Sequence, residues 1–137
     1  MGHYCKKLPL GTAQNLKYVV VLSFCEDKIL LSRHRARTTW ETQGGHIEPG
    51  ETPLQAAKRE LYEESGAVEY TIAPLFDYEA GDDLGSATGV VFRADITRLD
   101  RIPDSEMEEV RFFDALPENV TYPNITPHLF RWEREEN

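Results

Sequence analysis

Apolar residues along this chain first follow the pattern of β-strands. Residues 17–24 (KYVVVLSF) are apolar and rich in β-branched side chains, which predicts a strand. Glu26 and Asp27 predict a turn, and residues 28–33 predict the strand that returns from it. Further strands are expected at 40–41, 68–79, 87–97 and 110–114, with a loop at 81–85 and an acidic loop at 104–109.

A helical pattern interrupts the strands at residues 53–65. Thr52 is suited to cap the first turn, and Gln55, three residues later, completes a capping box. Proline is favoured at the first helical position, where Pro53 stands, and Gly66 is suited to the helix end. The sequence therefore predicts one well-delimited helix in the middle of the chain.

A second, short helix is expected near the C-terminus, where Thr126 and Pro127 repeat the cap-then-proline pattern. The 137 residues fit one domain, and a chain of this length can bury a core without disulfides. One central helix among several strands, with a closing helix, indicates a mixed α/β fold. We therefore predict a single α/β domain over residues 1–137.

Charge and cysteine content restrict the partners. A net charge of -9 argues against polymeric nucleic acid, whose binding requires a basic surface. Small phosphorylated substrates remain open, because bound cations reverse the local field. Cys5 and Cys25 lack CxxC partners, and free thiols are typical of the cytoplasm. Residues 1–7 have no apolar segment of a secretion signal, and no apolar run reaches membrane-spanning length, so no membrane partner is expected.

The 53–65 helix carries a cluster of acidic residues beside its apolar face. The apolar face, expected to pack on the sheet, is formed by Leu54, Ala57 and Leu61. Glu60, Glu63 and Glu64 fall within an arc of about 100° next to it. Like charges one turn apart destabilise a bare helix by about a few tenths of a kcal/mol, whereas Mg²⁺ or Mn²⁺ among them reverses that effect. Alone, such a run is more typical of a solvated surface.

The loop before the helix changes that interpretation. Residues 44–51 (GGHIEPGE) lead into the helix N-terminus, where exposed N–H groups and the helix dipole favour anions. Gly45, Gly50 and Thr52 have the spacing of a P-loop, but Glu51 stands where the phosphate-binding Lys belongs. Because a carboxylate repels phosphate, phosphate binding at this loop requires a cation.

Residues 45–67 resemble the signature of the Nudix hydrolase family, G-x5-E-x7-R-E-U-x-E-E-x-G-U, in which U is apolar. The fixed positions match in register, with Ala67 smaller than the usual residue: Gly45, Glu51, Arg59, Glu60, Leu61, Glu63, Glu64, Gly66 and Ala67. Residues 40–45 are similar to the family's W-E-x-P-G-G approach, with Gln43 in place of the common Pro. Residues 106–113 and 116–118 are similar to its acidic loop, late strand and L-P turn.

The resemblance implies the Nudix fold, an α/β/α sandwich around a mixed sheet, and Mg²⁺- or Mn²⁺-dependent hydrolysis of a nucleoside diphosphate linked to a group X. The implied metal ligands are the carboxylates of Glu60, Glu63 and Glu64 and the backbone carbonyl of Gly44. Glu63 or Glu64 would also orient or deprotonate the attacking water.

Further roles are implied by position. Arg59 and Glu51 would form an ion pair that positions the helix glutamates, and Gly45 would lie against the substrate. Glu106 is the candidate for an extra carboxylate from a late loop, with Asp104, Glu108 and Glu109 as alternatives. Arg33 and Arg35 are candidates for substrate contact, with Arg37 as a further alternative. Trp40, Tyr78 and Phe92 are of a kind to stack on a base, but packing is the expected role of each.

The leading functional hypothesis is a pyrophosphohydrolase of the MutT type. It would convert a nucleoside triphosphate, oxidised forms included, to the monophosphate and pyrophosphate. The alternatives are cleavage of ADP-ribose or a nucleotide sugar, and a module that binds nucleotide without hydrolysis. The retained glutamates speak against the last, because a pure binder need not keep a metal cluster. A small-molecule nucleotide is the expected partner, and the protein is expected to be a monomer or homodimer.

Overall fold

A seven-stranded mixed sheet forms the centre of the computed structural model, which describes residues 2–136. The strands are β1 (Tyr4–Leu8), β2 (Leu16–Cys25), β3 (Lys28–His34), β4 (Gln43–His46), β5 (Ala67–Asp82), β6 (Gly85–Leu99) and β7 (Met107–Phe113). They follow the order β1-β5-β6-β2-β3-β7, and β4 pairs with β2 off this path. β2 and β6 are parallel, and the other pairs are antiparallel. The two terminal residues of the expected 1–137 domain lie outside the described residues.

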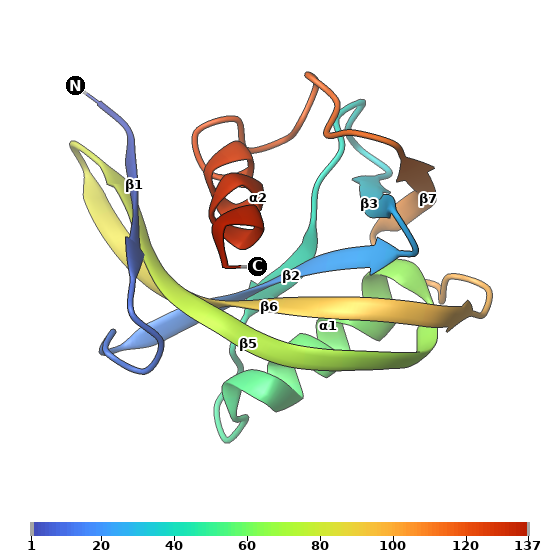
Figure 1. Cartoon of the computed structure of the whole chain (residues 1–137), viewed down its shortest axis with the longest axis horizontal. Coiled ribbons are helices and arrows are strands. Elements are labelled where there is room, and N and C mark those ends of the chain that lie inside the picture. The colour runs from blue at the N-terminus through green and yellow to red at the C-terminus, as the bar shows by residue number, and fades with distance from the viewer. Residues whose placement is uncertain (1, 137) are drawn as a thin grey trace.

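Two helices cover opposite faces of this sheet, α1 (Pro53–Ser65) and α2 (Thr126–Glu135) (Figure 1). Alternation along β2 divides the core between them. Val19 and Val21 join the cluster that packs against α1, whereas Leu22 joins the cluster that packs against α2. This arrangement is the expected α/β/α sandwich, so the predicted fold class is confirmed. No helix among the described residues is long and apolar enough to cross a membrane.

The predicted limits of α1 are confirmed by its caps. Gln55 N–H donates to Thr52 Oγ1 over 3.1 Å, and Thr52 N–H donates to the Gln55 side chain over 2.9 Å. Gly66 has a φ of 80° and ends the helix. The predicted apolar face is wrong at Leu54, which is 40% exposed. The first side chains that reach the core belong to the second turn, where Ala56 is buried, because the first turn extends past the core.

The hairpin of β5 and β6 is longer than expected, and the predicted loop at 81–85 is reduced to a turn at 83–84. Asp82 accepts a hydrogen bond from Leu84 N–H (2.8 Å) and pairs with Gly85 in the ladder. Gly81 suggests a loop in the sequence, but it belongs to β5. Glycine is needed there because the partner backbone comes very close, so that an added Cβ would lie 2.6 Å from Gly85 O.

The strand expected at Trp40 and Glu41 is displaced. These two residues make only isolated bridges, to Val120 and Ser32 respectively, and the strand itself is β4. The displacement arises because the two glycines of β4 pair with β2, whereas Trp40 and Glu41 do not.

Three other segments differ from expectation at the ends of the chain. β1 was not predicted, because it is short, largely exposed and paired with β5 alone. β7 begins at Met107, so part of the expected acidic loop belongs to an edge strand with exposed acidic side chains. α2 has Ile125 as its N-cap, without a side-chain cap, and Thr126 is buried rather than capping.

Candidate active site

Two glycines bring the backbone of β4 against β2 and against α1. Gly44 has a φ of 152°, and an added Cβ would lie 2.3 Å from Val19 O, so the backbones leave no room for a side chain. At Gly45 an added Cβ would lie 1.8 Å from Glu60 Oε2. Glycine at both positions therefore allows the carboxylates of α1 to approach the loop directly.

Glu64 and Glu60 are partly buried acids at this site. Gly44 N–H donates to Glu64 Oε1 over 2.8 Å, and Ser32 Oγ donates to the Glu64 carbonyl over 2.8 Å. Burial raises the pKa of Glu64 to about 9; the Gly44 hydrogen bond lowers it, and the nearby charges of Glu60 and Glu41 raise it. Burial likewise raises the pKa of Glu60 to about 7, against the lowering effect of Arg59. Both acids therefore favour a nearby cation.

Arg59 lies among the surrounding carboxylates and joins the loop to the helix. Its Nε and Nη2 donate to the two oxygens of Glu51 over 2.6 and 2.9 Å, which is the expected ion pair. Nη2 also donates to the His46 carbonyl, and Nη1 lies 3.4 Å from Glu60 and 3.3 Å from Glu63. The hydrogen bond from Arg59 lowers the pKa of Glu51 to about 2, and that bond raises the pKa of Arg59. The guanidinium thus fixes the orientation of three glutamates.

A divalent cation fits the donor set of this site. Two partly buried carboxylates with raised pKa values stand beside the backbone of Gly44 and Gly45, and oxygen donors are those that Mg²⁺ and Mn²⁺ prefer. Glu63, with 47% of its side chain exposed, is turned toward Arg59. Within residues 2–136 no three acidic, His or Cys side chains converge closely enough to enclose an ion. Water and substrate oxygens would therefore complete the shell, as is usual for Mg²⁺.

The late acidic segment faces the same groove from another element. The Glu106 side chain is 82% exposed, and its Oε2 lies 3.4 Å from His34 Nε2. Among its alternatives, Glu109 pairs with Arg33 and Arg111, and Asp104 lies 3.9 Å from Arg35. Glu106 is therefore placed to reach a ligand in the groove only from its outer rim.

The arginines of the 33–37 segment point in different directions. Arg33 binds Glu109 and the Arg37 carbonyl, and Arg35 donates to the Ser105 carbonyl. Neither is among the residues that line the groove, whereas Arg37 is. The two predicted substrate-binding arginines therefore lie outside the groove that the glutamates line, whereas the alternative, Arg37, lines it.

A broad groove of about 1440 Å³ runs from these glutamates toward α2 and the end of the β5–β6 hairpin. In Figure 1 the β5–β6 hairpin curls up beside β1, on the side of the sheet that α2 covers. Its lining includes Gly44 and Glu64 at one end, Tyr18 and Tyr78 on the sheet, and the segment 121–126 before α2. A groove of this size accommodates a nucleotide with room beyond the base.

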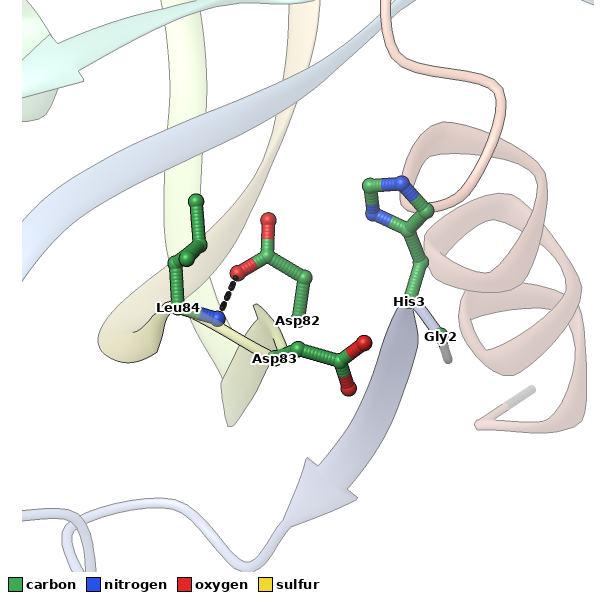
Figure 2. Close-up of a pocket in the computed structure, with 5 residues that line it drawn as sticks. All are labelled: Gly2, His3, Asp82, Asp83 and Leu84. Atoms are coloured by element: carbon green, nitrogen blue, oxygen red, sulfur yellow. Dashed lines mark hydrogen bonds between the residues drawn. The ribbon is translucent and has the colours of Figure 1, made fainter.

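A smaller cavity of about 280 Å³ lies at the hairpin turn (Figure 2). It is lined by Gly2, His3, Asp82, Asp83 and Leu84. Residues 44–67, all of which the structure describes, do not contribute to its lining. His3, Asp82 and Leu84 also line the far end of the groove, so the cavity is an extension of it rather than a second candidate active site.

The aromatic residues considered for base stacking are packed in the core, as expected. Trp40 is 6% exposed and lies edge-on to Phe113, and Phe92 is 2% exposed. Tyr78 is 5% exposed but also lines the groove. Sequence reasoning missed Tyr18, whose ring lies 4.6 Å from that of His46 beside the glycine loop. Its position within an apolar strand gave no sign that its side chain would face the groove.

The sequence model of the NUDIX domain matches residues 15–128, which is most of the chain. The protein is a member of the Nudix family. Among curated relatives, an RNA pyrophosphohydrolase of Francisella philomiragia is 35% identical over 71 residues, covering 47% of this chain and 46% of the relative. A Bacillus subtilis protein, YtkD, provisionally named an 8-oxo-dGTP diphosphatase, is 35% identical over 109 residues, covering 77% of this chain and 66% of the relative. The first of these matches spans less than half of the relative's length.

Solved structures of the family show the same fold. The Bacillus subtilis pyrophosphohydrolase BsRppH, solved as a point mutant, has a TM-score of 0.79 at 23% identity, with 100% of this chain and 98% of that chain covered. The NUDIX domain of Shewanella oneidensis NrtR, in complex with ADP ribose, has a TM-score of 0.67 at 20% identity, with 90% and 88% covered. This Nudix chain therefore keeps the family architecture, at sequence identities that establish the fold alone.

Proposed function

We propose that this Nudix protein is a divalent-metal-dependent hydrolase of phosphoric anhydride bonds in nucleoside 5′-polyphosphates. The observation that carries the proposal is the pair of partly buried carboxylates, Glu60 and Glu64, held against Gly44 and Gly45 at one end of a groove large enough for a nucleotide. Acids that are partly removed from water are costly to ionise without a cation, so this arrangement favours a site that binds metal.

The charged residues of the Nudix signature and its first glycine have roles in this proposal. Glu60, Glu63, Glu64 and the Gly44 carbonyl hold Mg²⁺ or Mn²⁺, with Glu106 as a further ligand from the rim. Glu63 or Glu64 orients or deprotonates the attacking water, and Gly45 lies against the substrate. The ion pair of Arg59 and Glu51 keeps the helix glutamates in place. When bound, the cation neutralises phosphate charge and lowers the pKa of a bound water.

Glu63 is paired with Arg59 in the structure, so in this proposal it would leave that ion pair to bind the metal. To join the ligands, its carboxylate would have to turn away from the guanidinium, which a change of side-chain torsions would allow, since 47% of the side chain is exposed. The two bonds of Arg59 to Glu51 do not involve Glu63 and would be kept.

Nucleoside triphosphates, oxidised forms included, are the leading substrates in the proposal, with the monophosphate and pyrophosphate as products. The relative provisionally named an 8-oxo-dGTP diphosphatase supports this choice, as it shares 35% identity over 77% of this chain. The triphosphate end of an RNA is the second candidate, supported by relatives named RNA pyrophosphohydrolase and by the open groove. An RNA end places few phosphates on the protein, so the net charge of -9 opposes it less than it opposes duplex binding.

The test is a Mg²⁺-dependent hydrolysis screen over canonical and oxidised triphosphates, 5′-triphosphorylated RNA, ADP-ribose, nucleotide sugars and dinucleoside polyphosphates. We expect the triphosphates to be hydrolysed fastest, and comparable slow turnover of all substrates would defeat this preference. Glu64→Gln should remove most turnover while nucleotide binding remains. Glu69→Gln, at an exposed carboxylate paired with Arg98, is the matched control and should keep full activity. Unchanged phosphate release by Glu64→Gln would exclude the catalytic assignment.

The proposal also includes a location and an oligomeric state. The two free cysteines, Cys5 and Cys25, are compatible with the cytoplasm, which we keep as the proposed location. The protein acts as a monomer or homodimer on a small nucleotide. Size-exclusion chromatography with light scattering decides between the two states.

A further inference from the structure

Gln43 is a fully buried polar side chain in the sheet, and it stands where Pro is common in the family pattern. Along one edge of β2, residues 23–25 pair with β3 and residues 18–21 pair with β4. Gln43 is the first residue of β4, so it lies at the point where one partner strand replaces the other. Buried polar groups at such a junction need hydrogen-bond partners from side chains.

The Gln43 amide joins β2 to β3 at this junction. Its Oε1 accepts a hydrogen bond from Ser23 Oγ over 2.6 Å. Its Nε2 donates to the Leu30 carbonyl over 3.3 Å and to Ser32 Oγ over 2.9 Å. Because a carbonyl can only accept a hydrogen bond, Leu30 determines which end of the amide is the NH₂ group. Both serines are fully buried, as Gln43 is.

This orientation of the amide determines what the Ser32 hydroxyl does. Because Gln43 donates to Ser32 Oγ, the hydroxyl proton points elsewhere, and it is donated to the Glu64 carbonyl over 2.8 Å. Glu64 lies in the last turn of α1, where carbonyl groups lack an N–H partner within the helix. The Ser32 backbone is held separately by two hydrogen bonds with the backbone of Glu41. A fixed strand therefore presents the hydroxyl to the end of the helix.

Gln43 also precedes the backbone group that holds the Glu64 carboxylate. Gly44 follows it in β4, and Gly44 N–H donates to Glu64 Oε1 over 2.8 Å. Glu64 is thus held at two places, at its carbonyl by Ser32 and at its carboxylate by Gly44. Hydrogen bonds from residues behind a metal ligand orient that ligand, and catalytic groups must be held within about 0.5 Å of their productive position.

We propose that Gln43 positions Glu64 for catalysis, through the Ser32 hydroxyl and through the backbone of Gly44. The inference rests on the proposed function, since that proposal assigns Glu64 to the metal. Gln43 and Ser32 are positioning residues, and neither is among the residues that line the groove. The carboxylate of Glu64 is therefore oriented by buried groups on the side away from the substrate.

The test compares Gln43→Met and Ser32→Ala with the unmodified protein. Methionine has a side chain of similar length but lacks the amide, whereas Ser32→Ala removes the bond to Glu64. Each change should weaken Mn²⁺ binding, measured by electron paramagnetic resonance, about 10- to 100-fold, the loss seen when partners of metal ligands are changed. The value of kcat should fall over the same range, while KM for a nucleoside triphosphate stays unchanged.

A readout in the metal-free protein tests the same positioning without catalysis. Loss of the Ser32 hydrogen bond frees the end of α1, so the bond from Gly44 N–H to Glu64 should open more often. Hydrogen exchange at the Gly44 amide should therefore accelerate in both variants, relative to the amides of the central strand β6. A global loss of stability would instead accelerate exchange in both places.

Asp77→Ala is the matched control, because it also removes buried hydrogen bonds, those to two backbone N–H groups of the 9–15 loop, and it lies outside the groove lining. It should lose stability but keep Mn²⁺ affinity, kcat and the Gly44 exchange rate. Adding Ser32→Ala to Gln43→Met should cause little further loss of Mn²⁺ affinity, since both changes remove the same path to the helix.

Losses of the expected size in Ser32→Ala that Asp77→Ala does not share support the inference. Normal Mn²⁺ affinity in Ser32→Ala, equal losses in Asp77→Ala or additive losses in the double variant overturn it, and the proposed function then stands. If Gln43→Met does not fold, Ser32→Ala decides alone, because it leaves the bond from Gln43 to Leu30 in place. Unchanged Mn²⁺ affinity and turnover in Glu64→Gln overturn both the inference and the proposed function.

Discussion

Replacing Gly45 by Ala tests whether the glutamate cluster of this Nudix protein binds metal. The new Cβ would lie 1.8 Å from Glu60 Oε2, and real Cβ atoms essentially never approach a neighbour within 3.0 Å. The carboxylate must therefore move by about 1.2 Å or more, which is large relative to Mg²⁺–oxygen distances of about 2.0–2.1 Å. We expect Mn²⁺ affinity to fall at least about 10-fold, the lower end of the loss seen when even outer residues of a metal site are changed.

The fold should survive this substitution, because the new methyl group meets the far end of a flexible side chain. Turnover should fall about 100-fold, the effect of misplacing a catalytic group by about 1 Å. Mn²⁺ affinity is measured by electron paramagnetic resonance, turnover by phosphate release, and folding by thermal unfolding.

Gly44→Ala is the contrasting variant, because its Cβ would lie 2.3 Å from the Val19 carbonyl, which cannot turn away. That variant should lose thermal stability, whereas Gly45→Ala should not. A third variant, Glu60→Ala, already lacks the displaced carboxylate, so adding Gly45→Ala to it should cost no further metal affinity. The reasoning is refuted if Gly45→Ala binds Mn²⁺ as tightly as the unmodified protein, or if the two substitutions act additively.

Three further predictions concern stability. Leu61→Ala should reduce the free energy of unfolding by about 2–5 kcal/mol in urea titrations, because Leu61 is fully buried, whereas Leu54→Ala should cost under about 1 kcal/mol; equal losses would contradict the helix placement. Asp77→Ala should cost about 1–3 kcal/mol, because this buried carboxylate accepts two backbone N–H groups of the 9–15 loop, and faster hydrogen exchange there would report their release. Because the folded protein holds the Glu64 proton up to a pKa of about 9 and the unfolded chain up to about 4.5, metal-free stability should fall as pH rises between these values, by up to about 1.4 kcal/mol per unit. Urea titrations in EDTA from pH 5 to 9 measure this slope, and the same slope in Glu64→Gln would exclude Glu64 as its source.

Features determined by neighbours in the chain were predictable from the sequence. The limits of α1 follow from Thr52, Gln55 and Gly66, which act within one turn of the helix ends. The Arg59–Glu51 ion pair was expected from the family pattern and is present in the structure, because loop and helix are contiguous. The strands expected at 17–24, 28–33, 68–79 and 87–97 are present for the same reason, whereas the strand expected at 40–41 is not.

Features determined by distant segments were not predictable. Arg33 and Arg35 are preferred to Arg37 in the sequence prediction, whereas the pairing of β3 with β7 places Arg33 against Glu109 and leaves Arg37 to line the groove. β1 exists as a strand because β5 extends far enough to pair with it. A single sequence contains no record of these long-range contacts, since each side chain involved has an ordinary polar or apolar character.

The parallel pairing of β2 with β6 has a consequence for the order in which the molecule can fold. Residues 45–67, which match the Nudix signature, all precede β6 in the chain. However, β2 gains its parallel partner strand only when β6 has formed. A nascent chain that ends before residue 85 therefore contains all of residues 45–67 but lacks the β6 side chains of the core cluster that includes α1, among them Val90, Phe92 and Ala94. Contacts this far apart in sequence form slowly and leave apolar surface exposed meanwhile. Residues 45–67 are thus complete early in synthesis, but the core cluster that packs against α1 is completed only with β6.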